Sequence, residues 1–154
     1  MADREEVRIV ARNRKAKFDY ELSERFEAGL VLLGSEVKSL REGRAQLEDA
    51  YAKMQNGEVW LHHAHIPEYE KATIETHDPK RPRKLLLHRQ EIRKLKTKLA
   101  ERGFTLVPLS LYFKGPYAKV EVALAKGKKR FDKRESMRAT EDRREMQRAS
   151  RRRR

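Results

Sequence analysis

The sequence predicts a mainly β protein: a small closed antiparallel barrel of about six strands, with two to three flanking helices and a basic C-terminal tail. Several short segments alternate apolar and polar residues, which is the pattern of a strand with one buried face. An Asn56-Gly57 pair separates two of these segments, and such a pair is the strongest short-range indication of a β-hairpin. Strands and helices do not alternate along the chain, which argues against a parallel sheet and favours a barrel.

The composition limits the chain to one modest domain and a tail. Charged residues make up 40% of the 154 residues and hydrophobic residues 38%, so the core is small. No apolar run of about 18 residues predicts a transmembrane helix, and the first residues lack the apolar segment of a secretory signal. The chain has no cysteine, which excludes disulfides and thiolate metal sites and suits a reducing, cytoplasmic location.

The positive charge is concentrated at the C-terminus. From Lys126 onward, 14 Lys/Arg stand against 5 Asp/Glu, a local charge of +9 out of +14 for the chain. This segment has few apolar side chains and cannot bury enough surface to offset the loss of conformational entropy. Its residue types nevertheless favour a helix, and Arg134 and Arg138 are spaced to share one helical face. We therefore expect a tail that is disordered when free and helical against a polyanion.

The expected organisation is a flexible N-terminal arm at 1–12, a folded domain at 13–126 and the basic tail at 127–154. A sequence pI near 10.2 indicates a polyanionic partner. A nucleic acid is favoured over an anionic membrane, because a helix that lies on a membrane needs an apolar face and the tail has none.

The first part of the domain is expected to contain two strands and a helix. Residues 18–22 alternate, and residues 25–33 form a second strand in which Gly29 marks a bulge or a barrel corner. A short helix over residues 34–43 follows. Its capping, first-turn and end signals are Ser35, Glu36 and Gly43.

The middle of the chain is expected to form a hairpin and then a long loop. Residues 49–54 and 58–66 are the two strands that the Asn56-Gly57 turn joins. Residues 67–84 are a polar loop, which at this length in a compact domain is usually functional or mobile. Its basic run, Lys80 to Lys84, is either solvated or in contact with nucleic acid.

A helix and two strands complete the domain. The helix runs from about residue 89 to 102 and ends at Gly103. In the strand over residues 105–113, the core face is expected to carry Val107, Leu109, Leu111 and Phe113, with Pro108 at an edge or a bulge. In the strand over residues 117–125, Val120, Val122 and Leu124 face inward, and Lys119 and Glu121 face outward.

Other chemistry is disfavoured by spacing. Among the histidines of the second hairpin strand, only His63 and His65 share a face, and no carboxylate follows at ligand spacing, so no metal site is expected. Glu48 and Asp49 are adjacent and point to opposite faces of a strand, which argues against paired acid–base catalysis. No catalytic residue and no cofactor are therefore predicted. Three aromatic residues could stack on RNA bases, but a position in the core or at its rim is favoured for each: Trp60, Tyr112 and Tyr117.

Seven blocks, in this order and spacing, resemble the SsrA-binding protein family (small protein B, the partner of transfer-messenger RNA), over residues 12 to 138. The blocks are Asn13-Arg14-Lys15-Ala16, Phe26-Glu27-Ala28-Gly29-Leu30, Gly34-Ser35-Glu36-Val37-Lys38-Ser39-Leu40-Arg41, Arg83-Lys84-Leu85-Leu86-Leu87-His88 with Glu91-Ile92, Thr105-Leu106-Val107-Pro108-Leu109, Gly127-Lys128-Lys129 and Asp132-Lys133-Arg134.

The resemblance implies a fold and a function. The family fold is a small antiparallel barrel related to the oligonucleotide-binding fold, with three helices. The family binds the tRNA-like domain of transfer-messenger RNA and brings it, as alanyl-tmRNA with elongation factor Tu, to ribosomes stalled on messages without a stop codon. Its tail enters the empty mRNA channel near the decoding centre of the small subunit and folds as a helix. This process, trans-translation, tags the nascent chain for proteolysis, with no catalysis by the protein itself.

The resemblance also implies site residues. The RNA-binding positions of the body are Asn13, Lys15, Glu27, Lys84, Leu86 and Lys119. The ribosome-binding positions of the tail are Gly127, Lys128, Lys129, Phe131, Asp132, Lys133 and Arg134. The family commonly has His or Tyr where this chain has Phe131, which keeps base stacking and loses a polar contact. The run Arg151 to Arg154 departs from the family pattern and is expected to give general phosphate affinity.

Three functions are considered from the sequence. The first is the RNA-binding adaptor of ribosome rescue, acting as a monomer. The second is a general RNA-binding or ribosomal accessory protein that uses the same barrel and tail. The third is an RNA hydrolase, which lacks the acid–base constellation that it needs.

Overall fold

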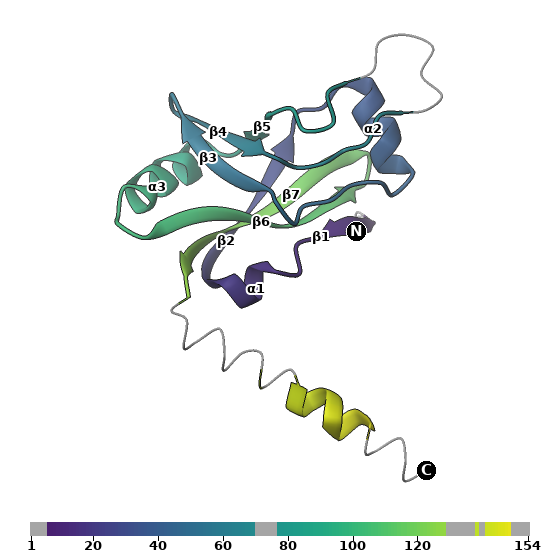
Figure 1. The fold of residues 1–154 in the computed structure, drawn as a ribbon. Coiled ribbons are helices and arrows are strands. Elements are labelled where there is room, and N and C mark those ends of the chain that lie inside the picture. Colours follow the sequence, from purple (N-terminus) through teal and green to yellow (C-terminus); the bar gives the residue numbers. More distant parts are fainter. Residues whose placement is uncertain (1–5, 70–76, 129–137, 139–140, 149–154) are drawn as a thin grey trace, which may run out of the picture.

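The computed structural model describes residues 6–69, 77–128, 138 and 141–148, and its sheet confirms the predicted class (Figure 1). Seven antiparallel strands follow the order β1-β6-β3-β4-β5-β2-β7, and a further β6–β7 pairing closes six of them into a ring. In chain order the elements are β1 (Val7–Arg12), α1 (Ala16–Asp19), β2 (Tyr20–Leu30), α2 (Gly34–Arg41), β3 (Tyr51–Gln55), β4 (Glu58–His62), β5 (Arg83–Leu86), α3 (Arg89–Leu99), β6 (Phe104–Lys114) and β7 (Tyr117–Gly127).

The hydrophobic core fills the ring of six strands. Alternate residues of each strand point inward, as expected where one face is buried. The fully buried leucines of the strands are Leu61, Leu85, Leu106, Leu111 and Leu124. The helices α2 and α3 lie on opposite sides of the barrel (Figure 1) and bury Leu40 and Leu95 against the same core.

The hairpin prediction is confirmed in detail. Strands β3 and β4 pair from Tyr51 with His62 to Gln55 with Glu58. The two residues between them, Asn56 and Gly57, have φ angles of 51° and 76°. Both values are positive, as a two-residue turn that matches the right-handed twist of the strands requires. The inward prediction for Val120, Val122 and Leu124 on β7 is also confirmed.

The N-terminal part differs from the prediction. Residues Val7–Arg12 were expected in a flexible arm, but they form β1, which pairs with β6. The predicted strand over residues 18–22 begins instead as the short helix α1, and β2 then runs without interruption from Tyr20 to Leu30. A register shift between Leu22 and Arg25 lets β2 follow β7 along its whole length.

Strand β6 contains a bulge that reverses the expected faces. The register with β7 shifts between Pro108 and Ser110, so the bulge expected at the proline is confirmed. The prediction that Val107 and Leu109 face the core was wrong. The extra residue moves the alternation by one position, and both side chains pack with Ala16 of α1 in a small second cluster outside the barrel.

Helix α2 begins differently from the prediction. Leu33, rather than Ser35, occupies the N-cap position, and its backbone N–H donates to the carboxylate of Glu36 at 2.8 Å. The Ser35 hydroxyl is hydrogen-bonded to His77 Nδ1 at 2.9 Å. Gly43, with a φ of 77°, ends the helix as predicted.

A buried ionic network joins α2 to the start of β5. Glu36 and Arg83 are both fully buried, and the Arg83 guanidinium donates to the Glu36 carboxylate, to Ala64 O at 2.7 Å and to Pro79 O at 3.1 Å. Arg81 donates to both carboxylate oxygens from Nε at 3.1 Å. Arg83 was expected in a solvated or nucleic-acid-binding run, and this was wrong: its charge is inside.

The same network sets the charge state of Glu36. Burial alone raises the pKa of this carboxyl, but the donors Arg81, Leu33 N–H and Arg83 outweigh burial and hold the pKa below its ordinary value of 4.5. A carboxyl with a depressed folded pKa stabilises the fold fully above its unfolded pKa, and this contribution is lost as pH falls toward the folded pKa.

Residues 141–148 form a helix whose side chains are all exposed (yellow in Figure 1). Of the positions named for the tail, Lys129, Phe131, Asp132, Lys133 and Arg134 lie outside the described residues, as does the run Arg151 to Arg154. Among the helices described, none combines the length and the apolar character needed to span a membrane.

We predict that Glu36→Ala destabilises the fold by about 3–5 kcal/mol, because it leaves the Arg83 charge buried without its partner. Urea denaturation at pH 7 measures the loss. In the wild type, stability falls as pH drops below about 4.5, and this acid-dependent part is reduced in the variant. The matched control is Glu58→Ala, which removes the half-exposed pair with Lys84 and costs less than about 1 kcal/mol. Equal losses in the two variants would contradict the prediction.

Candidate nucleic-acid interface

One cross-strand row on the outside of the barrel contains two of the expected RNA-binding residues. Gly29 of β2 pairs with Leu86 of β5 on one side and with Lys119 of β7 on the other. Lys119 in turn pairs with Tyr112 of β6. Residues directly opposite each other in antiparallel strands share a face. We call these four residues the binding row: Leu86, Gly29, Lys119 and Tyr112.

Gly29, at the centre of the binding row, has no side chain, so the Leu86 side chain can lie over its backbone. A Cβ added at Gly29 would lie 3.3 Å from Leu86 Cβ and 3.6 Å from Leu86 Cδ1, so the leucine side chain lies over the glycine. Leu86 is 53% exposed, although it is apolar. An exposed apolar side chain, with a lysine across β2 on the same face, offers a surface for a base or a sugar and a cation for a phosphate.

Glu27 lies two residues before Gly29 on β2 and borders the binding row. Its carboxylate accepts hydrogen bonds from the Tyr112 hydroxyl and from Lys114 Nζ, the latter at 3.3 Å. The Tyr112 hydrogen bond is the largest influence on the pKa of Glu27 and lowers it; partial burial opposes this, while Lys114 and Lys119 lower the pKa further. Glu27 is therefore ionised at neutral pH, and its carboxylate holds the side chains of Tyr112 and Lys114.

Two further basic positions lie at the sides of the binding row. Lys84 is on β5 two residues from Leu86, on the same outer face, and pairs with Glu58 at 3.1 Å. On the other side, Arg25 Nη1 lies 3.1 Å from a carboxylate oxygen of Glu121, the residue that pairs with Glu27. Glu121 faces outward, as the sequence predicts.

Asn13 has a structural contact that sequence reasoning did not show. Its Nδ2 donates to Pro108 O at 3.0 Å and its backbone N–H to Leu109 O at 2.8 Å, at the bulge of β6. Asn13 lines a pocket of about 530 Å³ that is also lined by Glu121. Glu121 is the residue that pairs with Glu27. Lys15 is the N-cap residue of α1 and is exposed. Three cations that line this pocket are additional candidates for contact with RNA: Arg12, Arg14 and Lys17.

The start of the expected tail is attached to the barrel. Gly127 is the last residue of β7 and pairs with Tyr20, and the Lys128 N–H donates to Asp19 O at 2.9 Å. Lys126 Nζ lies 4.5 Å from the centroid of the Phe104 ring. Gly127 and Lys128 are therefore joined to the body by backbone hydrogen bonds.

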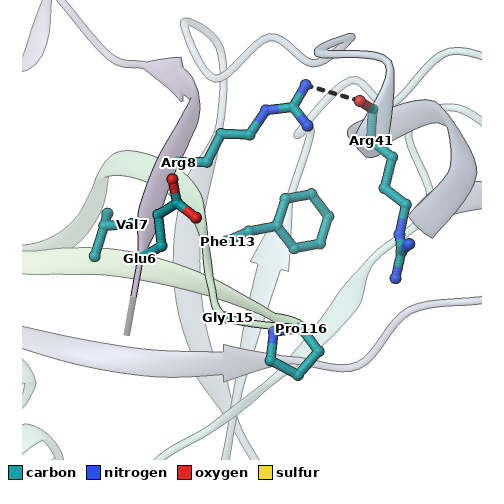
Figure 2. A pocket seen from close by; sticks show the side chains of 7 residues that line it. All are labelled: Glu6, Val7, Arg8, Arg41, Phe113, Gly115 and Pro116. Carbon is teal, nitrogen blue, oxygen red and sulfur yellow. Dashed lines mark hydrogen bonds between the residues drawn. The ribbon is translucent and has the colours of Figure 1, made fainter. Parts of the chain in front are cut away.

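Figure 2 shows a different pocket, of about 660 Å³, at the end of the barrel where β6 turns into β7. The Phe113 ring lies between the side chains of Arg8 and Arg41, and Arg8 Nη2 donates to the backbone oxygen of Arg41 at 2.8 Å. Phe113 is almost completely buried, so its ring belongs to the core. The pocket holds charged groups but no nucleophile hydrogen-bonded to a base, the arrangement that covalent catalysis needs.

Metal binding receives no support from the described residues, which contain no group of three or more His, Asp or Glu side chains placed to hold an ion. His63 and His65 do line one pocket with Glu48 and Asp49.

We predict that Tyr112→Phe raises the pKa of Glu27 toward 4.5, because the variant removes the strongest hydrogen bond to the ionised carboxylate. An NMR pH titration of the Glu27 side chain measures the change. Lys114→Ala also raises the Glu27 pKa, since it removes a weaker hydrogen bond and a nearby positive charge. An unchanged Glu27 pKa in Tyr112→Phe would show that the hydroxyl does not hold the carboxylate.

Comparison with known proteins assigns the chain to a family. A family model described as "SmpB protein" matches residues 10–152. The chain is 59% identical over 147 residues to the SsrA-binding protein of Thermobifida fusca (strain YX), covering 96% of this chain and 92% of that protein. It is 54% identical over 144 residues to the SsrA-binding protein of Carboxydothermus hydrogenoformans, covering 94% and 97%.

A solved structure shares the fold. It is described as "tmRNA-SmpB: a journey to the center of the bacterial ribosome", and one of its chains is 46% identical to this one with a TM-score of 0.66, covering 82% of this chain and 93% of that chain. The fold, the length of the match and the level of identity agree with the resemblance of the seven sequence blocks. The chain belongs to the SmpB family of SsrA-binding proteins.

Proposed function

We propose that this protein is an RNA-binding adaptor of trans-translation, which binds the tRNA-like domain of transfer-messenger RNA and delivers it to stalled ribosomes. The observation that carries the proposal is the binding row on the outside of the barrel, in which Gly29 pairs with the exposed Leu86 on one side and with Lys119 on the other, and Leu86 lies over the glycine. Membership of the SmpB family supports it, since relatives carry the name SsrA-binding protein and a similar solved chain is described with tmRNA and the ribosome.

In this proposal the body holds one RNA through complementary contacts. Lys119 neutralises a phosphate, and Leu86 packs on the face of a base or a sugar. Glu27 acts by holding the side chains of Tyr112 and Lys114 through hydrogen bonds to its carboxylate. Asn13, Lys15 and Lys84 extend the contact at the margins of the row.

The tail makes the second contact of the adaptor. Gly127 and Lys128 lead the chain away from the barrel, and Lys129, Phe131, Asp132, Lys133 and Arg134 enter the small subunit between decoding centre and mRNA channel. The exposed helix at 141–148 supports a helical tail. A segment with a net charge of +9 from Lys126 onward is attracted to ribosomal RNA whatever the RNA sequence.

The proposal also covers the oligomeric state, the location and the partners of the protein. The protein acts as a monomer in the cytoplasm, with alanyl-tmRNA and elongation factor Tu, and the broken message is released while the nascent peptide is tagged for degradation. The protein contributes binding and positioning rather than catalysis, and it uses no cofactor.

We predict that Lys119→Ala weakens binding of the tRNA-like domain and flattens the slope of log affinity against log salt by about one unit, because one phosphate contact is lost. Titrations from about 0.05 to 0.2 M salt measure the slope. The control is Lys96→Ala, an exposed lysine on the outer side of α3, which leaves binding at physiological salt nearly unchanged.

The same titrations separate the adaptor from a general RNA-binding protein. In competition at about 0.15 M salt, the adaptor prefers the tRNA-like domain over bulk tRNA and over fragments of ribosomal RNA. Equal affinity for all three RNAs, or an identical salt slope in Lys119→Ala and wild type, would contradict the proposed function.

We predict that a chain ending at Lys128 keeps its affinity for the tRNA-like domain within about threefold at physiological salt, because all seven strands are retained. Tagging of peptides on stalled ribosomes is lost, since the segment that enters the channel is missing. Filter binding and a reconstituted tagging reaction measure the two effects. The control is the full chain under the same conditions, and a truncated chain that no longer binds the tRNA-like domain would overturn the division between body and tail.

A further inference from the structure

The β3–β4 hairpin presents a second set of side chains on the outside of the barrel. Tyr51 pairs with His62 across the hairpin, and Lys53 pairs with Trp60. Trp60 also pairs with Lys84 of β5. Opposite residues share a face, so these side chains lie on the same outer surface as Leu86 and continue around the barrel from the binding row. We call the rings of this surface the stacking strip: Tyr51, Trp60, His62 and His63.

The Tyr51 ring is stacked with two imidazoles of the stacking strip and is partly exposed to solvent. The Tyr51 ring lies 5.2 Å from the His62 ring at an interplanar angle of 10°, and 5.3 Å from the His63 ring at 27°. Tyr51 is 41% exposed. Trp60 is half-buried and stands outside the cluster that fills the barrel. Exposed rings in parallel order are what unpaired bases stack on.

The backbone at His63 is in an unfavourable conformation that creates this arrangement. His63 has a φ of 61°, one of two positive values among the non-glycine residues described. In a strand that continued past His62, the next side chain would point to the opposite face. The left-handed turn instead brings both imidazoles beside the Tyr51 ring, at a cost of order 1–3 kcal/mol that the rest of the fold must offset.

The charges near the strip separate a base-binding end from a phosphate-binding end. Lys53 has no ion-pair partner in the described part of the chain, and Lys84 is only half-buried beside Glu58. At the other end, His63 shares a pocket with Glu48 and Asp49, whose carboxylates repel phosphate. Burial, with nearby His63 and Lys53, lowers the pKa of His62, so this ring is neutral at pH 7. The rings thus suit bases, and the lysines suit the backbone.

We propose that the stacking strip is a second RNA-binding surface, which takes two or three unpaired bases of a single-stranded segment while Lys53 and Lys84 hold its phosphates. The inference deepens the proposed function and rests on it for the identity of the RNA. Because β5 carries both Lys84 and Leu86, one RNA can lie across the binding row with a structured part and continue over the hairpin with an unpaired loop.

The test uses the full chain and its single tryptophan, Trp60. Octaadenylate RNA quenches Trp60 fluorescence at about 0.15 M salt, whereas an abasic octamer of equal length and charge does not. Tyr51→Ala raises the concentration for half-quenching by about tenfold, within the range for loss of one stacked base. Tyr51→Phe, which keeps the ring, behaves like the wild type. Tyr117→Ala is the matched control, since it removes an exposed tyrosine outside the strip.

The outcomes separate this inference from the proposed function. Equal quenching by the two octamers, or unchanged half-quenching in Tyr51→Ala with a wild-type melting curve, overturns the stacking strip. If Tyr51→Ala melts early, His62→Ala replaces it with the same expected loss. Preference for the tRNA-like domain without quenching by octaadenylate leaves the proposed function standing and rejects the strip. Quenching without that preference supports the strip and rejects the adaptor.

Discussion

The buried contact between Glu36 and Arg83 fixes which side chains of β5 face outward. This strand has only four residues, and its alternation sends Arg83 and Leu85 inward and Lys84 and Leu86 outward. Arg83 makes its contacts inside the fold, to α2 and to the loop before the strand. A slip of one residue would place the arginine in solvent and bury Lys84 without a partner. The ion pair thus stabilises the register of β5, on which the proposed RNA-binding surface depends.

Barrel closure then brings distant parts of the chain together. The binding row joins β5, β2, β7 and β6, which come from opposite ends of the domain. Gly29, Lys119 and Tyr112 pair with a neighbouring strand on both sides, and Leu86 pairs with Gly29. The sheet therefore holds the backbone of the row in place. The described helix at 141–148 differs from the row, because all of its residues are exposed. In the proposed function, the paired strands and the cationic C-terminal segment contact two different RNAs.

Local sequence patterns predict most of the strands and helices. They fail where contact with a residue far along the chain determines whether a segment forms a strand or a side chain is buried. The hairpin at Asn56-Gly57 and the alternation of β7 are properties of adjacent residues, so the sequence predicts them. Strand β1 exists because β6 offers an edge about a hundred residues later, although Val7 and Ile9 remain exposed. The burial of Arg83 depends on a carboxylate 47 residues away. The site residues came from family resemblance; the roles of Gly29 and Tyr112 emerged only from the register.

The central claim is that the outer row across β5, β2 and β7 is the surface that meets RNA. The most direct measurement is an NMR map of backbone amide shifts in the full chain during titration with the tRNA-like domain. The account predicts that the largest changes fall at Gly29, Leu86 and Lys119 and continue onto the β3–β4 hairpin. Changes confined to the Arg8–Arg41 pocket and α2, with the row unaffected, would contradict it.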